Sequence, residues 1–267
     1  MTAKSPLPLA NRSDADLPGH WLLARLGKRV LRPGGLELTR RLLTAARVTG
    51  ADVVELGPGL GRTATDIVAA GPRSYVGVDD TAAATEAVRR IVEPVDGKVV
   101  VANAADTGLP SGSADVVIGE AMLTMQGDRD KRVIVNEAFR VLRPGGRYAI
   151  HELGLQPDSL PQDTKDQIRK DMARAIKVNA RPLTASEWVN LLTDAGFEVV
   201  SVDHAKMALL NPGRVLADEG LFGALRIVGN LIRRPAARKR VIGMRKTFQR
   251  YRHSLTAIAV VGVVPEK

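Results

Sequence analysis

The chain has 267 residues, of which 45% are hydrophobic, enough to bury one large core. It contains no cysteine, which excludes disulfides, thiolate metal ligands and a cysteine nucleophile. Its net charge of +10 is concentrated in one segment, because ten basic residues and no acid lie between Gly220 and Pro265. These ten account for the whole excess of 39 basic over 29 acidic residues, so the rest of the chain is close to neutral.

The chain begins with a polar, proline-bearing stretch that we expect to be a loosely attached tail up to about Pro18. It lacks an apolar signal core, and no apolar run is long enough to span a bilayer, so we expect a cytoplasmic protein. Helices are predicted over residues 20–26 and 36–47, separated by a proline-glycine break. Residues 1–35 are thus expected to form a tail and a cap helix.

The stretch 52–62 carries the most specific signal in the chain. A β-branched apolar run ends in Glu55, and three glycines (Gly57, Gly59 and Gly61) follow at every second position. The pattern predicts a strand, a tight glycine loop and a helix, the unit that opens a doubly wound α/β sheet. Glycine is needed because the loop turns sharply and lets a ligand approach the backbone with no Cβ in the way. The spacing differs from the G-x-G-x-x-G fingerprint of dinucleotide-binding loops.

Acidic and small residues follow the next two predicted strands. The strand over residues 75–79 ends in Asp79, about twenty residues past the glycine loop, where a carboxylate binds ribose hydroxyls. Asp80 is the alternative for this role. A third strand leads to Asn103-Ala104. We therefore expect an adenosine-containing ligand at this edge of the sheet.

The E-x-G-x-G-x-G loop, the acid after the second strand and a fourth strand over residues 114–118 resemble the class I S-adenosylmethionine-dependent methyltransferases. The resemblance covers about residues 41–202 and the final strand, and it implies that S-adenosylmethionine is the cofactor. The cofactor-binding residues that it implies are Glu55, Gly57, Pro58, Gly59, Gly61, Asp79, Asp80, Asn103, Ala104 and Glu120. Where relatives usually have an aspartate facing the adenine amino group, this chain has Asn103. Either its amide oxygen or the carboxylate of Asp106 would accept that bond.

The remaining elements follow in the order of that family. Helices are predicted over residues 81–92 and 128–142, and a fifth strand begins after an R-P-G-G turn. A capping box at Thr184 and Glu187 opens another helix, with a strand beyond it. The resemblance implies an α/β fold with a doubly wound, seven-stranded Rossmann-like sheet. Its last strand, over residues 255–264, would be inserted antiparallel between the fifth and the sixth.

Residues 36–206 and 254–267 are expected to form the cofactor-binding domain, and residues 207–253 an inserted helical lid. One apolar stripe of the lid is formed by Leu221, Leu225, Val228 and Ile232. A second stripe lies over residues 241–251, beyond a helix break at Pro235. We expect both stripes to pack on the domain and on the substrate.

The basic residues of the lid, within residues 226–252, allow three interpretations. They form a solvated face without a partner, a surface that draws an anionic acceptor towards the site, or a contact for a membrane surface or nucleic acid. Nucleic acid is disfavoured because aromatic residues, on which bases stack, make up only 3% of the chain.

Three residues at strand ends are the candidates for catalysis. Methyl transfer is a displacement whose leaving group is already activated, so the protein mainly orients the reactants. A hydroxyl acceptor also needs a base. Glu120 ends the fourth strand, and His151 and Glu152 end the fifth, where doubly wound folds bind ligands. We expect His151 to take the proton, with Glu152 or Glu120 orienting it. A cofactor contact is the alternative role of Glu120.

We therefore predict an S-adenosylmethionine-dependent methyltransferase that methylates an oxygen of a small-molecule acceptor. One alternative is a membrane-associated lipid or quinone methyltransferase that docks through the basic lid. A second is a protein that binds S-adenosylmethionine without catalysing transfer. No metal is predicted, because no group of Asp and His residues has ligand spacing.

Overall fold

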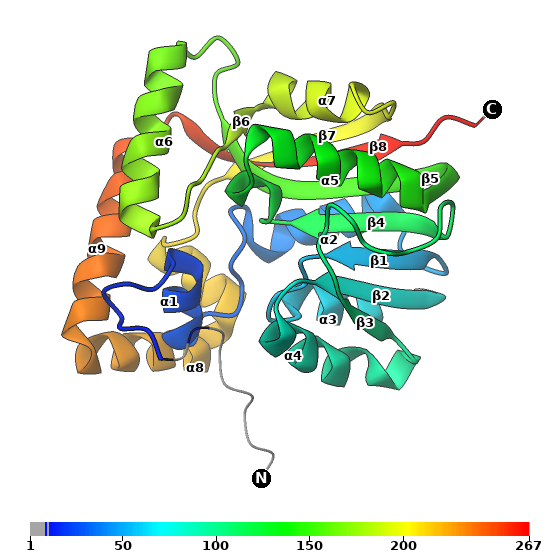
Figure 1. Ribbon diagram of the computed structural model, residues 1–267. Coiled ribbons are helices and arrows are strands. Elements are labelled where there is room, and N and C mark those ends of the chain that lie inside the picture. The colour runs from blue at the N-terminus through cyan, green and yellow to red at the C-terminus, as the bar shows by residue number, and fades with distance from the viewer. Residues whose placement is uncertain (1–8, 10, 267) are drawn as a thin grey trace.

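A mixed β-sheet forms the centre of the protein (Figure 1). The computed structural model describes residue 9 and residues 11–266. The main strands are β1 (Asp52–Leu56), β2 (Ser74–Asp79), β3 (Lys98–Val101), β4 (Ala114–Glu120), β5 (Leu142–Leu155), β7 (Glu198–Lys206) and β8 (Leu255–Val263). Their order is β3-β2-β1-β4-β5-β8-β7, and the short β6 (Leu183–Thr184) pairs with β5. Strand β8 runs antiparallel between β5 and β7, which confirms the predicted topology.

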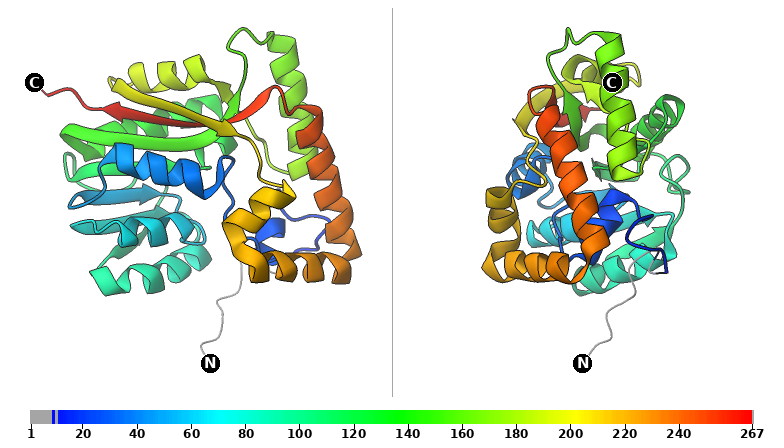
Figure 2. Two further views of the ribbon diagram at one scale, coloured as in Figure 1. Left: turned by 180° about the vertical axis from the view of Figure 1, so that it is seen from behind. Right: turned by 90° about the vertical axis from the view of Figure 1, so that its left-hand side faces the viewer.

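Helices cover both faces of the sheet (Figure 2). One face carries α2 (Gly35–Ala46), α3 (Arg62–Ala69) and α4 (Ala82–Val92), and the other carries α5 (Asp128–Val141) and α7 (Ala185–Thr193). The inner strands β1, β4 and β8 are buried on both faces, which explains why they read as nearly continuous apolar runs. The predicted capping box of Thr184 and Glu187 is present at the start of α7.

Four further helices gather where the parallel strands end (Figures 1 and 2). They are α1 (Gly19–Arg25), α6 (Gln162–Ile176), α8 (Pro212–Arg233) and α9 (Pro235–Arg250). Helices α1, α6 and α9 share an apolar core to which Leu22, Ile168 and Met244 contribute. Helix α8 bends at Gly220, whose φ of 71° lies in the left-handed region.

The expectation of a loosely attached tail up to Pro18 is wrong for residues 11–18, and residues 1–8 and 10 lie outside the described part of the chain. The carboxylate of Asp14 forms an ion pair with Arg25 at 2.9 Å. Leu17 is fully buried in the core of the four-helix group. Arg240 of α9 donates hydrogen bonds to the backbone carbonyls of Asp14 and Leu17. These contacts fix the segment against the outer helices.

One of the two apolar stripes does not pack as predicted. In α9, Met244 and Phe248 are buried, in agreement with the prediction. In α8, the side that faces the protein carries Gly223 and Ile227, which are buried. The predicted stripe of Leu221, Leu225, Val228 and Ile232 is exposed instead. Helical periodicity shows which residues share a face, but it does not show which face the domain covers.

Candidate active site

The glycine loop connects the end of β1 to the start of α3. Gly57, Gly59 and Gly61 have φ angles of 65°, 54° and 74°, a region that residues with a Cβ adopt only with strain. At Gly61, a Cβ would also lie 2.4 Å from the side chain of Ile91. The loop therefore exposes its backbone at the carboxyl end of the sheet.

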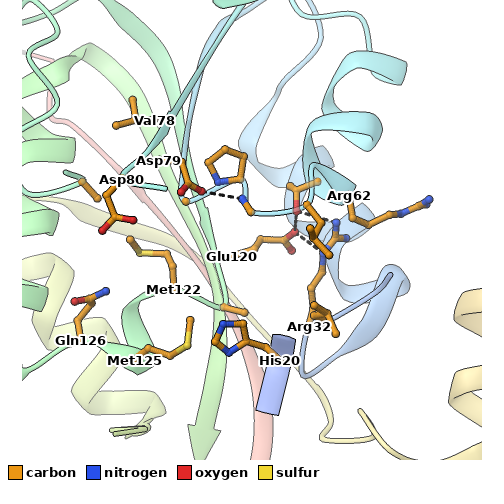
Figure 3. A pocket seen from close by; sticks show the side chains of 18 of the residues that line it. His20, Arg32, Arg62, Val78, Asp79, Asp80, Glu120, Met122, Met125 and Gln126 are labelled. Carbon is orange, nitrogen blue, oxygen red and sulfur yellow. Dashed lines mark hydrogen bonds and ion pairs between the residues drawn. The ribbon is translucent and has the colours of Figure 1, made fainter. Parts of the chain in front are cut away.

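Asp79 holds the glycine loop from the next strand. One carboxylate oxygen accepts a hydrogen bond from the backbone N–H of Gly59 at 3.0 Å (Figure 3). The other accepts from the backbone N–H of Thr81 at 2.9 Å. Burial raises the pKa of Asp79, and the two backbone donors partly offset that rise. Each oxygen keeps a lone pair with which it can accept a ligand hydroxyl.

A cavity of about 270 Å³ opens between the glycine loop, the ends of β2 and β4, and the segment before α2. The predicted cofactor residues that line it are Gly57, Pro58, Gly59, Asp79, Asp80, Asn103, Ala104 and Glu120. Asn103 lines the cavity, whereas Asp106 is not among the lining residues. The Asn103 side-chain oxygen already accepts a hydrogen bond from the backbone N–H of Ala105 at 2.8 Å. Glu55 and Gly61 do not line it either.

Glu55 lies beneath the loop, where the hydroxyl of Tyr75 donates a hydrogen bond to it at 2.7 Å. Its side chain is buried, and burial raises its pKa to about 8. The predicted cofactor residue is therefore neutral at pH 7 and supports the sheet from within.

Glu120 is the centre of a buried polar network. One oxygen accepts hydrogen bonds from the Thr39 hydroxyl at 2.6 Å and from His151 Nδ1 at 2.8 Å. The other accepts from the Thr63 hydroxyl at 2.5 Å and forms an ion pair with Arg32 Nε at 2.9 Å. Burial alone would raise the pKa of Glu120, but the Arg32 charge and these hydrogen bonds lower it to about 2. The carboxylate is therefore ionised at any physiological pH.

His151 is completely buried, and both of its ring nitrogens are occupied. Nε2 accepts a hydrogen bond from the backbone N–H of Gly34 at 3.1 Å, so the proton lies on Nδ1, which donates to Glu120. The ring lines neither this cavity nor the apolar one beside it. Its contacts join β5 to the segment before α2, and they leave no nitrogen free to accept a proton from an acceptor.

Glu152 shapes the wall between the two cavities. Its oxygens accept hydrogen bonds from the backbone N–H groups of Met122, Leu123 and Thr124 and from the Thr124 hydroxyl. Burial raises the pKa of Glu152, against the effect of these four donors. The carboxylate thus orders the turn after β4. Of the three predicted catalytic residues, the structure brings Glu120 and His151 into direct contact, whereas Glu152 bonds to the turn after β4.

A second cavity, of about 110 Å³, adjoins the first. Its lining is almost entirely apolar and includes Leu23, Leu153, Met172, Met207, Leu209, Met244 and Phe248. Four residues line both cavities: His20, Leu31, Ala121 and Met125. The apolar cavity is therefore separated from the polar one only by a short boundary.

His20 is the functional candidate that the sequence did not reveal. It lies at the boundary of the two cavities, next to Met125 (Figure 3). Burial lowers its pKa to about 4, so the imidazole is neutral at pH 7. Neither ring nitrogen has a hydrogen bond to any described residue. No motif marks this position, because α1 lies outside the strand-loop-helix units of the sheet.

The residues of the polar cavity fit S-adenosylmethionine. Asp80 lies on the opposite side of the cavity from Arg32 and Arg62 (Figure 3). Arg62 Nε is buried without a hydrogen-bond partner in the described chain, and the carboxylate of the cofactor's amino acid portion would satisfy it. Asp79 would accept from the ribose hydroxyls. By contrast, no cluster of His, Asp and Glu in the described residues could hold a metal ion.

Comparisons with known proteins agree with this geometry. A methyltransferase domain model matches residues 54–150. An uncharacterised protein of Haemophilus influenzae is 35% identical over 250 residues, which is 92% of this chain and 97% of the relative. A probable S-adenosylmethionine-dependent methyltransferase of Mycolicibacterium smegmatis is 34% identical over 58% of this chain and 55% of its own length. The solved structure of the [4+2]-cyclase SpnF shares the fold, with a TM-score of 0.72 and 13% sequence identity. The match covers 99% of this chain and 100% of the cyclase chain.

The glycine loop supplies a direct test of the cofactor site. Gly57→Val and Gly59→Val should each abolish binding of S-adenosylmethionine, because a β-branched residue at positive φ distorts the backbone that lines the cavity. Isothermal titration measures the affinity. Gly108→Val is the matched control, because Gly108 also has positive φ (69°) but does not line the cavity. Normal binding by the Gly57 and Gly59 variants would contradict this assignment.

The raised pKa of Glu55 predicts a pH-dependent stability. The folded protein holds this proton up to about pH 8, whereas the unfolded chain releases it near pH 4.5, so the contribution to stability is lost as the pH rises. The parent should therefore lose about 3 kcal/mol of its free energy of unfolding between pH 5 and pH 8, relative to the Glu55→Gln variant, which has no carboxyl group to titrate at this position. Urea unfolding at several pH values measures this difference. A difference that stays constant over this range would show that Glu55 is ionised in the folded state.

Proposed function

The chain belongs to the class I S-adenosylmethionine-dependent methyltransferases, and we propose that it methylates an oxygen of a small, largely apolar acceptor. The observation that carries this proposal is the apolar cavity next to the polar one, with a boundary of only four shared residues. S-adenosylmethionine supplies an activated methyl group, so the chain has to orient the acceptor, exclude water and accept a proton.

The apolar cavity supports the binding of an acceptor by its hydrocarbon part. Leu23 of α1, Met172 of α6 and the α9 residues Met244 and Phe248 line it. All four are buried, so an apolar group placed among them is removed from water. A flat or branched acceptor that fills this space would direct its remaining polar end to the boundary with the polar cavity.

His20 supports methylation on oxygen. A hydroxyl group at the boundary can donate its hydrogen bond to the imidazole, which is neutral and has no other partner in the described chain. The base that we infer is therefore His20 and not His151, whose nitrogens are used by Gly34 and Glu120. The His151–Glu120 pair would then hold the polar wall in place while the hydroxyl proton passes to His20.

The proposal is tested with a panel of apolar alcohols and phenols, each paired with the amine and the thiol of the same skeleton. We expect release of S-adenosylhomocysteine with one or more hydroxyl compounds, and a methyl ether as the product. Turnover of the amines alone would contradict methylation on oxygen. The absence of any product, together with tight cofactor binding, would support the alternative of a protein that binds S-adenosylmethionine without turnover.

Replacement of the base gives a sharper prediction for an acceptor found in this way. His20→Asn should lower kcat by about a hundredfold, because the hydroxyl loses its proton acceptor. The affinity for S-adenosylmethionine, measured by titration, should change little. His204→Asn is the matched control, since His204 is exposed on β7 and lines neither cavity. An unchanged kcat in His20→Asn would exclude His20 as the base.

The pH profile separates this base from an ordinary histidine. His20 has to be unprotonated to accept the proton, and burial lowers its pKa to about 4. The parent kcat should therefore stay level down to about pH 5 and fall only below it. His20→Asn should lose this acidic limb, whereas a merely structural role for His20 would leave the shape of the profile unchanged.

A further inference from the structure

The second half of α8, beyond the bend at Gly220, presents an apolar face to solvent. The exposed fractions are 61% for Leu221, 58% for Leu225, 51% for Val228 and 66% for Ile232, and Phe222 beside them is 87% exposed. Their spacing places the four aliphatic side chains on one helical face. The helix thus packs on the protein through Gly223 and Ile227, and leaves these larger apolar side chains uncovered.

Positive charge without counterions surrounds this face. Arg226 and Arg233 lie on α8, and Arg238 and Lys239 lie in the first turn and a half of α9. All four are exposed, and none forms an ion pair with a described residue. The segment between residues 220 and 265 contains no acid that could neutralise them. An apolar stripe flanked by unpaired cations is complementary to a surface that has both hydrocarbon and anionic groups.

We propose that α8 docks the protein on the surface of an anionic phospholipid bilayer. The five apolar side chains enter the boundary between headgroups and acyl chains, and the four cations meet the lipid phosphates. The contact is peripheral, since none of the helices that the structure describes is long and apolar enough to cross a bilayer.

The charge argues against a second copy of this chain as the occupant. A two-fold interface through the same face would bring the four unpaired cations of each copy together, and like charges repel across an interface. An anionic bilayer instead neutralises them.

Vesicle co-sedimentation of the full chain tests the proposal without any assay of methyl transfer, so its outcome is independent of the proposed activity. Vesicles of phosphatidylcholine alone are compared with vesicles that also contain phosphatidylglycerol. We expect binding to the anionic vesicles that weakens as the salt concentration rises. No binding to anionic vesicles at low salt would overturn the proposal.

Two variants separate the apolar from the electrostatic contribution. The first variant combines Leu221→Ser, Phe222→Ser and Leu225→Ser. It should bind anionic vesicles about tenfold more weakly than the parent, because it removes apolar area from the docking face. Arg226→Gln with Arg233→Gln should reduce partitioning to anionic vesicles by about tenfold or more. Titration with S-adenosylmethionine and circular dichroism confirm that the variants remain folded.

Matched controls carry the same changes elsewhere on the surface. Val133→Ser with Val200→Ser removes exposed aliphatic side chains, and Arg129→Gln with Arg132→Gln removes exposed cations on α5. Both controls should partition like the parent. Equal losses in the controls and the α8 variants would overturn the assignment to α8. A parent that is dimeric, with monomeric α8 variants, would show that a second copy covers this face, and would also overturn it.

Discussion

The buried ion pair between Glu120 and Arg32 is the interaction on which the geometry of the site depends. Both side chains are almost inaccessible to water, so each charge requires the other, and removal of one partner would cost about 3–5 kcal/mol. Thr39, Thr63 and His151 complete the hydrogen bonds of the carboxylate. The network therefore ties β4 and β5 to α2, to α3 and to the segment that precedes α2, which together surround the polar cavity.

A second buried carboxylate extends this connection to the outer helices. Glu219 of α8 accepts hydrogen bonds from the backbone N–H groups of Arg29 and Val30 at 2.7 and 2.8 Å. The ammonium group of Lys28 lies 3.8 Å from the same carboxylate and is also buried. The segment from Lys28 to Arg32 is thus held by α8 at one end and by β4 at the other. Because α1 precedes this segment directly, the two carboxylates together position His20 at the boundary of the cavities.

The sequence sufficed to predict the sheet, because hydrophobic runs, glycine turns and the capping box of α7 are local signals. Eight of the ten cofactor residues that it predicted line the polar cavity, since these residues follow strand ends whose order the family resemblance supplied. The sequence did not suffice to place His20 at the site or to show that the apolar stripe of α8 faces solvent. His20 is brought to the site by long-range contacts of α1, and the face of α8 that packs on the protein is set by tertiary contacts of Gly223 and Ile227.

The contrast between His151 and His20 shows why position along a strand is not enough to identify a base. His151 stands where a doubly wound fold places ligand-binding residues, yet its two nitrogens are used to join β5 to the backbone of Gly34 and to Glu120. A proton acceptor needs a free lone pair that faces the substrate, and that condition is decided by tertiary contacts. We propose that His20 meets this condition, because it lies at the boundary of the two cavities and neither of its ring nitrogens has a hydrogen bond within the described residues.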